Sequence, residues 1–280
     1  MSATLPALYP LRTDPVYRHY IWGGNRLGPL LGKPPGPNGT LAESWEIADE
    51  ARVAGGAWHG HTLREVDEAT GGALTGDSPH YPNARLPILI KLSDSAQNLS
   101  VQIHPNDEQA LSMEPDSGYP GKTEMYLVLA AEEGAGVYWG LREGVSPEQL
   151  EQACRTGWGV PDLLHFVPVK PGDVLYSPSG VVHAIGEGIV YCEVQQNSDI
   201  TFRLFDWGRV DTDGKPRPLH LEKALAVLDV TKQKTKPIQP LTFPTERHGV
   251  TRTMLCACRY FAVELLEFFA DESAPTSAGA

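Results

Sequence analysis

Four side chains from three separate stretches of the sequence could together bind one metal ion. Gln102 and His104 lie two residues apart in the stretch Leu99–His104, where apolar and polar residues alternate. This alternation predicts a β-strand, in which both side chains leave the same face. Glu124 precedes a second apolar run, and His183 lies in a third stretch. Imidazole and carboxylate groups are common ligands of zinc, iron and manganese, so we predict a metal site built on strands.

The stretch that ends at His183 has a further feature typical of metal-binding β-barrels. From Gly172 to His183 it follows the spacing Gly-x5-Pro-x-Gly-x2-His. This spacing is typical of the second motif of cupins, where the Pro-x-Gly turn presents the histidine inside the barrel. Taken singly, His104 is expected at a strand end in water, and His183 in the core with a hydrogen-bond partner. The four residues in this order favour the metal site, and chemistry alone supports Gln102 least, because glutamine is a poor metal ligand.

The composition argues against several classes of protein. The chain of 280 residues has 35 acidic and 23 basic residues and a net charge of −12, which disfavours binding to nucleic acid or to an anionic membrane surface. No apolar run approaches the ~18 residues of a membrane span, and the N-terminus does not have the pattern of a signal peptide. Four cysteines in a chain this long do not predict a disulfide framework, so we expect a cytoplasmic protein.

Many short apolar or alternating runs, separated by glycine and proline, predict a mainly β fold. A sandwich or a barrel would satisfy this pattern, and the jelly roll is the version that encloses a site. The sequence contains neither a long repeat nor a glycine-rich nucleotide motif. We expect strands at residues 87–92, 99–104, 125–130 and 251–269, and short helices over Leu63–Thr75, from Pro147 to near Thr156, and over His220–Val230.

The domain organisation predicted from these runs is uneven. Residues 1–236 are expected to form a metal-binding catalytic domain. Residues 237–280 are expected to form a short or truncated second β-domain segment, with strands within Thr251–Phe269 and a disordered tail at 271–280.

Several stretches, in combination, resemble the type I phosphomannose isomerases, which are cupin-fold mannose-6-phosphate isomerases, and are most similar to the short bacterial branch of that family. The resemblance implies an all-β cupin double-stranded β-helix, or jelly roll, that interconverts D-mannose 6-phosphate and D-fructose 6-phosphate. Long members of the family have a histidine where this chain has Gly121. The shared stretches are Trp22–Gly24, Glu43–Glu46, Leu99–Asp107, Gly121–Glu124, Gly172–Gly188 and Cys192–Arg209.

The same resemblance implies a role for individual residues. The metal would be one Zn2+ per chain, with other divalent metals as alternatives. Its ligands would be Gln102, His104, Glu124 and His183. The catalytic positions fall on Arg203, its acidic partner Glu193, Lys122 and Asp199, and the positions that contact substrate phosphate or sugar fall on Lys91, Ser100 and Lys122.

The chemistry of an aldose–ketose isomerase is consistent with these residue types. Such an enzyme moves a proton between C1 and C2 through an enediol, so negative charge develops on two adjacent oxygens. A metal ion can polarise these oxygens, and a cation such as Arg203 can stabilise the charge. Either Glu193 or Lys122 would carry the proton, and the sequence does not rank them. Lys91, inside an apolar run, is either at a strand end in solvent or aimed at an anion such as phosphate.

Three functions therefore fit the sequence. The first is the zinc-dependent isomerase, the second is a non-catalytic metal-containing cupin that binds a sugar or sugar phosphate, and the third is another cupin enzyme, such as an iron oxygenase. Arg203, Glu193 and Lys122 favour the first, because a protein that only binds its ligand needs no proton shuttle. An iron centre with two histidines and one carboxylate would not need Gln102. We expect a small sugar phosphate as the ligand, and a monomer or homodimer.

Overall fold

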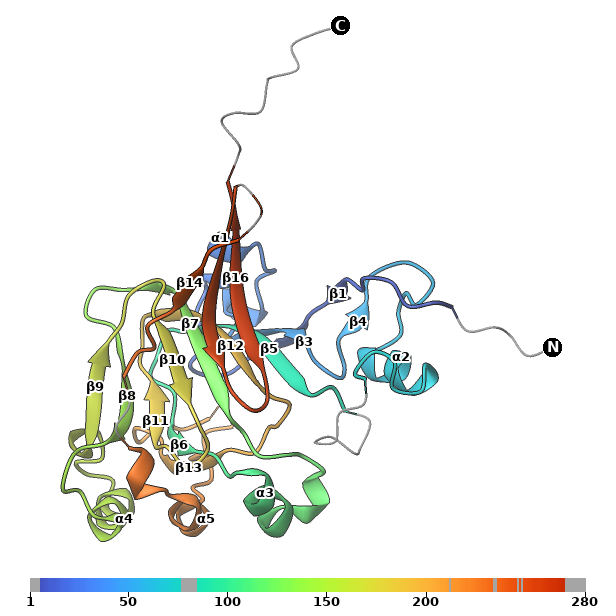
Figure 1. Cartoon of the computed structure of the whole chain (residues 1–280). Helices are drawn as coiled ribbons and strands as arrows, with labels where there is room; N and C mark the ends of the chain where they lie inside the picture. Colours follow the sequence, from blue (N-terminus) through green and yellow to red (C-terminus); the bar gives the residue numbers. More distant parts are fainter. Residues whose placement is uncertain are drawn as a thin grey trace, which may run out of the picture.

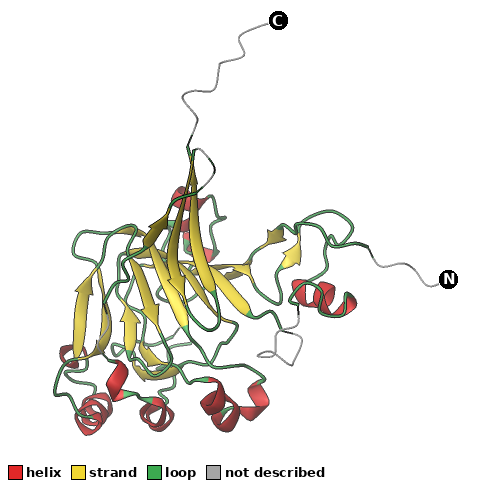
Figure 2. Ribbon diagram, viewed as in Figure 1, coloured by secondary structure: helices red, strands yellow, loops and turns green. Residues whose placement is uncertain are grey.

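The computed structural model describes residues 6–76, 85–211, 213–233, 236–245, 247 and 249–269. The tail predicted at 271–280 lies outside these residues. Two antiparallel sheets form the body of the molecule, and strands dominate the ribbon (Figure 1, Figure 2). The prediction of an all-β cupin jelly roll with a few short helices is confirmed.

The larger sheet of the body has six strands and the smaller sheet has five. In spatial order the larger sheet contains β10 (Val174–Ser177), β7 (Glu124–Ala131), β12 (Ile189–Gln196), β5 (Ile88–Ser95), β3 (Glu43–Ile47) and β2 (Val16–Arg18). The smaller sheet contains β13 (Phe202–Phe205), β6 (Val101–Ile103), β11 (His183–Ile185), β8 (Gly136–Leu141) and β9 (Leu164–Pro168). A separate short pair is formed by β1 (Thr13–Asp14) and β4 (Arg52–Val53).

Alternation along the strands decides which side chains reach the space between the sheets. Val101 and Ile103 of β6 are buried in an apolar cluster with residues of the helices, so Gln102 between them points to the opposite, inner face. In the larger sheet, Tyr126 and Tyr191 are buried in a second cluster, which also contains inward residues of the smaller sheet. The inner faces therefore place polar groups among aromatic side chains, as an enclosed site requires.

The helices are short, and three of them cover one end of the molecule. These are α3 (Asp107–Met113), α4 (Pro147–Thr156) and α5 (Leu221–Val227), which lie side by side at the bottom of Figure 1. The other two, α1 (Leu27–Leu31) and α2 (Leu63–Ala69), belong to the N-terminal part. No helix among the described residues is long and apolar enough to cross a membrane.

The predicted helices are confirmed in type and corrected in length. α4 has the expected start, where Ser146 and Gln149 form a capping box. The predicted helix Leu63–Thr75 ends at Ala69, because Gly71 and Gly72 then adopt positive φ values of 66° and 85°. The predicted helix His220–Val230 likewise ends at Val227, since the next residue is extended.

The C-terminal part forms a separate antiparallel sheet of three strands. It contains β14 (Leu241–Phe243), β15 (Val250–Ala257) and β16 (Ala262–Phe268). Leu255 and Cys256 of β15 pack with Met125 and Val194 of the larger sheet in one buried cluster. The rest of the three-stranded sheet extends beyond the body, at the end opposite α3–α5 (Figure 1).

Candidate active site

Three buried side chains, His104, Glu124 and His183, converge between the two sheets. Their candidate ligand atoms all lie within 4.8 Å of one another. Oε1 of Glu124 is 3.1 Å from Nε2 of His104 and 2.9 Å from Nε2 of His183. Two imidazole nitrogens and one carboxylate oxygen that face the same point are a donor set that suits a divalent cation such as zinc.

Neighbouring groups orient both imidazoles toward this point. Nδ1 of His104 is 2.9 Å from the carbonyl oxygen of Ile200, and Nδ1 of His183 is 3.1 Å from that of Val181. Because a carbonyl oxygen only accepts, each Nδ1 carries the proton and each Nε2 keeps a free lone pair. Burial and the positive charge of Lys122 lower the pKa of His104 to about 4, so this ring is in the neutral form that binds metals.

Gln102 lies beside this group. It is directly opposite His183 in the pairing of β6 with β11, and its Nε2 is 3.5 Å from Nε2 of His183. Ser100 Oγ donates to the amide oxygen of Gln102 at 3.3 Å. A half-turn of the amide exchanges its oxygen and nitrogen. The side chain thus reaches the group, and it would offer an oxygen to a cation after that rotation.

Two lysines and a carboxylate form a second buried cluster next to the histidines. Nζ of Lys122 is 3.0 Å from Oε2 of Glu124 and 3.8 Å from Oε1 of Glu193. Lys91 lies directly opposite Glu193 in the pairing of β5 with β12, and its Nζ is 3.3 Å from Oε1 of Glu193. The alternative of a solvent-exposed Lys91 is therefore wrong, since this side chain is buried.

Burial raises the pKa of Glu193 to about 7, although the charges of Lys91 and Lys122 act in the opposite direction. A carboxyl group with a pKa near neutrality can both accept and return a proton. By contrast, Lys122 and His104 outweigh the effect of burial at Glu124 and hold its pKa well below the usual range. The two carboxyl groups therefore have different pKa values, because their surroundings differ.

A cavity of about 300 Å3 opens in front of both clusters. Gln102, Lys122 and Tyr126 line it and contact the histidine–glutamate group behind them. Its volume is at the lower end of the range for small-molecule pockets. The other residues that line it are Tyr20, Trp22, Glu43, Lys91, Leu99, Ser100, Tyr191, Glu193, Asp199, Thr201, Arg203 and Arg217.

Arg203 enters the cavity from the side of the smaller sheet. It lies directly opposite Gln102 in the pairing of β13 with β6, and its Nη1 donates to the carbonyl oxygen of Pro218 at 2.9 Å. Its buried Nε has no hydrogen-bond partner among the described residues. No ion pair joins Arg203 to its expected acidic partner Glu193 in the part of the chain that the structure describes. The two side chains instead line the same cavity. Asp199 lines the same cavity but is exposed.

The structure also places residues at the site that we did not predict. Tyr126 donates from its hydroxyl to Oε1 of Glu124 at 2.5 Å, and its position two residues after Glu124 in a strand is a signal that alternation could have supplied. Glu43 is buried, accepts from Nε1 of Trp45 at 2.6 Å and lies 4.0 Å from Lys91. Arg217 lies in a loop rich in proline and glycine, and no periodicity marks it.

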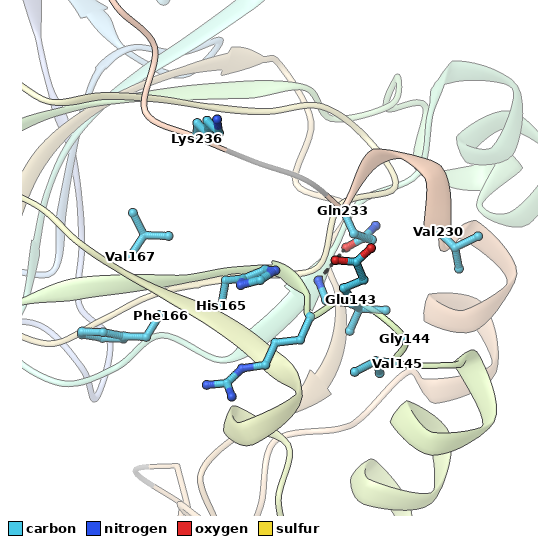
Figure 3. A pocket seen from close by; sticks show the side chains of 11 residues that line it. Glu143, Gly144, Val145, His165, Phe166, Val167, Val230, Gln233 and Lys236 are labelled. Atoms are coloured by element: carbon cyan, nitrogen blue, oxygen red, sulfur yellow. Dashed lines mark hydrogen bonds between the residues drawn. The ribbon is translucent and has the colours of Figure 1, made fainter.

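A larger cavity, of about 540 Å3, lies elsewhere and contains none of the predicted site residues (Figure 3). Its charged side chains, Arg142, Glu143, His165 and Lys236, are all exposed. Exposed charges keep their hydration and interact weakly. The buried charges and the converging ligand atoms thus identify the smaller cavity as the candidate active site.

Fold and site together define a class of protein: a cupin with a buried candidate metal centre beside a lysine–carboxylate cluster. A family profile described as "Phosphomannose isomerase type I, catalytic domain" matches residues 10–139. "Mannose-6-phosphate isomerase ManA" of Bacillus subtilis is 38% identical over 264 residues, which cover 91% of this chain and 78% of that protein. The chain therefore belongs to the type I phosphomannose isomerase family.

Solved structures agree with this assignment. The crystal structure of the mannose 6-phosphate isomerase from Bacillus subtilis superposes with a TM-score of 0.82 at 32% identity, over 92% of this chain and 80% of that one. A mannose 6-phosphate isomerase described as "holo; zinc bound" has a TM-score of 0.63 at 18% identity, over 88% of this chain and 83% of that one. At 18% identity, the similarity to this second structure supports the fold alone.

Proposed function

We propose that this protein interconverts D-mannose 6-phosphate and D-fructose 6-phosphate through an enediol. The observation that carries the proposal is one cavity that joins the histidine–glutamate group to the buried cluster of Lys91, Lys122 and Glu193. Membership of the family and the names of its relatives support the same activity.

His104, Glu124 and His183 would hold the metal ion, with Gln102 as a fourth ligand. Nitrogen and oxygen donors with oriented imidazoles fit Zn2+, and we propose one ion per chain. When bound, the ion would act as a Lewis acid that polarises the oxygens on C1 and C2 of the sugar.

The remaining residues would move and stabilise the proton and the charge. Isomerisation removes the proton from C2 of the aldose, and a double bond forms between C1 and C2 as the carbonyl oxygen on C1 gains a proton. The proton then returns to C1, and the hydroxyl on C2 loses its proton and becomes the carbonyl group of the ketose. Glu193 is our candidate for the group that takes up and returns this proton, because its pKa of about 7 suits both steps. Lys122 would hold Glu193 in place and donate to a sugar oxygen, and Arg203 would stabilise the negative charge of the enediolate.

The other cavity residues would bind the sugar phosphate. Lys91 and Ser100 line the cavity beside Lys122 and Gln102, and we propose that they contact the substrate. Asp199, at the exposed side of the cavity, is a further candidate acid. We further propose a catalytic part at residues 1–236 followed by a β-segment, and a monomer or homodimer. We also propose a cytoplasmic location, because all four cysteines are free.

A coupled assay that follows fructose 6-phosphate from mannose 6-phosphate tests the function. We expect turnover that a chelator abolishes and added Zn2+ restores, because His104, Glu124 and His183 are placed to hold a required ion. Folded, zinc-loaded protein that binds the sugar phosphate without turning it over would contradict the isomerase proposal. It would leave the non-catalytic sugar-phosphate-binding cupin as the function.

A further inference from the structure

We propose that Arg217 binds the phosphate group of the substrate at the end of the cavity farthest from the histidines. The inference rests on the proposed function and deepens it, since it names the residue that selects a phosphorylated sugar. Arg217 is not among the residues that the sequence indicated.

The order of residues along the smaller sheet supports this placement. His183, Gln102 and Arg203 lie directly opposite one another on three adjacent strands, β11, β6 and β13. β13 is the edge strand of this sheet. Nη1 of Arg203 donates to the carbonyl oxygen of Pro218 at 2.9 Å. The loop that carries Arg217 therefore lies next to Arg203, on the side away from Gln102 and His183. A sugar with C1 and C2 at the histidines would extend its C6 phosphate toward Arg217.

The charges around Arg217 favour an anion. Asp206 accepts two hydrogen bonds from Arg217, from Nε at 2.7 Å and from Nη2 at 2.6 Å, and a third from Nη2 of Arg209 at 2.6 Å. Arg203 lies in the field of the same charges, which include a second carboxylate, Asp211, so three guanidinium groups face two carboxylates. Burial and, after it, the positive charge of Arg217 lower the pKa of Arg203.

The two buried lysines are neutralised to a greater extent. Lys91 lies between Glu193 and Glu43, at 3.3 Å and 4.0 Å, and Lys122 pairs with Glu124 at 3.0 Å. The three guanidinium groups at the other end of the cavity exceed the two carboxylates around them by one positive charge. In a chain with a net charge of −12, they are therefore the part of the site that best suits a phosphate dianion.

Arg217 also has a suitable donor available. Among the described residues, Arg217 donates through Nε and Nη2, which leaves Nη1 available. The buried Nε of Arg203 has no hydrogen-bond partner among these residues either. Asp206 holds the guanidinium plane of Arg217 in position, so little side-chain entropy remains to be lost on binding. A fixed guanidinium that presents free N–H groups binds phosphate oxygens through charge-assisted hydrogen bonds.

The chain offers a matched control for the experiment. Arg209 also donates to Asp206, but it does not line the cavity. We therefore compare Arg217→Gln with Arg209→Gln in the zinc-loaded, full-length protein. The readouts are kcat and KM with mannose 6-phosphate, kcat/KM with unphosphorylated mannose, and the dissociation constant of inorganic phosphate measured by calorimetry.

We expect Arg217→Gln to raise KM for mannose 6-phosphate and the dissociation constant of phosphate by about 10- to 100-fold, the range of one charged hydrogen-bonding group. Turnover of unphosphorylated mannose should change by less than about threefold, because that substrate never uses the phosphate contact. Arg209→Gln removes a positive charge of the same group but no side chain that lines the cavity. We therefore expect it to raise KM and the dissociation constant of phosphate by less than about threefold, well below the effect of Arg217→Gln.

Equal losses in the two variants would overturn the inference, because Arg217 would then act only through Asp206. If Arg217→Gln does not fold, Arg217→Lys replaces it. We expect weaker phosphate binding in that variant too, since lysine cannot form the fork to Asp206, and unchanged binding would contradict the proposal. The calorimetry is independent of catalysis. If the wild type binds phosphate, Arg217→Gln weakens this binding and the wild type does not isomerise the sugar, the proposed function is wrong. The inference that Arg217 binds an anion would still hold.

Discussion

At the scale of single residues, Glu124 is the side chain that contacts most of the other groups of the site. Its Oε1 lies within hydrogen-bond distance of Tyr126 and of both histidines, and its Oε2 faces Lys122. One carboxylate thus offers an oxygen to a metal ion and fixes a lysine beside the substrate cavity. Glu193 differs from it, because burial holds the pKa of Glu193 near neutrality. The difference in pKa between the two carboxyl groups follows from their surroundings, since the two side chains are identical.

The pH dependence of activity tests the role of Glu193. A base must be ionised to accept a proton, so kcat/KM should be lost as the pH falls below the pKa of Glu193. We expect the rising limb of the profile at or somewhat below pH 7, because a bound divalent cation nearby favours the ionised form. Glu193→Gln should lower kcat/KM by about 10²- to 10⁴-fold and remove this limb. A Gln variant that keeps both the limb and most of the activity would assign the proton transfer to another group, with Lys122 as the first candidate.

At the scale of strands and loops, the sequence predicted the members of the site better than their contacts. Alternation in Leu99–His104 correctly indicated that Gln102 and His104 share a face. The neighbours across the strands were not predictable, because register between distant strands depends on the packing of the whole sheet. Gln102 meets His183 across 81 positions, and Lys91 meets Glu193 across 102.

Loops were the least predictable part of the site for a related reason. Their conformation depends on tertiary contacts and leaves no periodic signal. We therefore did not predict Arg217 as a site residue. The sequence also did not indicate why a glycine precedes Lys122. A Cβ at Gly121 would lie 2.4 Å from the carbonyl carbon of Asn106 and 2.6 Å from the backbone nitrogen of Asp107. In this chain there is no room at that position for the histidine of the long family members.

Gly121→Ala tests this close approach. The backbone of Asn106 and Asp107 begins α3 and cannot move away cheaply, so we expect a loss of about 1–3 kcal/mol in the free energy of unfolding. Lys122 should also be displaced, and kcat should fall by up to about 10²-fold. Gly55→Ala is the control, because a Cβ there would meet nothing within 4 Å, and its melting temperature should stay near that of the wild type. Equal melting temperatures and activities in the two variants would contradict the argument.

At the scale of the whole molecule, the C-terminal sheet supports the catalytic strands from behind. Leu255 and Cys256 share a buried cluster with Met125 and Val194, which are the sequence neighbours of Glu124 and Glu193. Inward side chains form the site, and the next residue along each strand faces the C-terminal sheet. At the boundary proposed at residue 236, the chain thus passes from the strands of the body to the C-terminal sheet. The buried core includes residues from both sides of this boundary.

A shortened chain that ends at residue 236 tests this coupling. It would expose Met125, Val174 and Val194, and each such side chain contributes about 1.5–3 kcal/mol when buried. The sum is comparable with the 5–15 kcal/mol that stabilises a typical protein. We therefore expect the melting temperature to fall by about 10 °C or more, or folding to fail. A chain that ends at residue 269 keeps every described residue of this cluster and should match the full-length protein. If the chain of 236 residues instead melted within a few degrees of full length and retained its activity, the catalytic part would be an independent domain, and the support we infer from the C-terminal sheet would be absent.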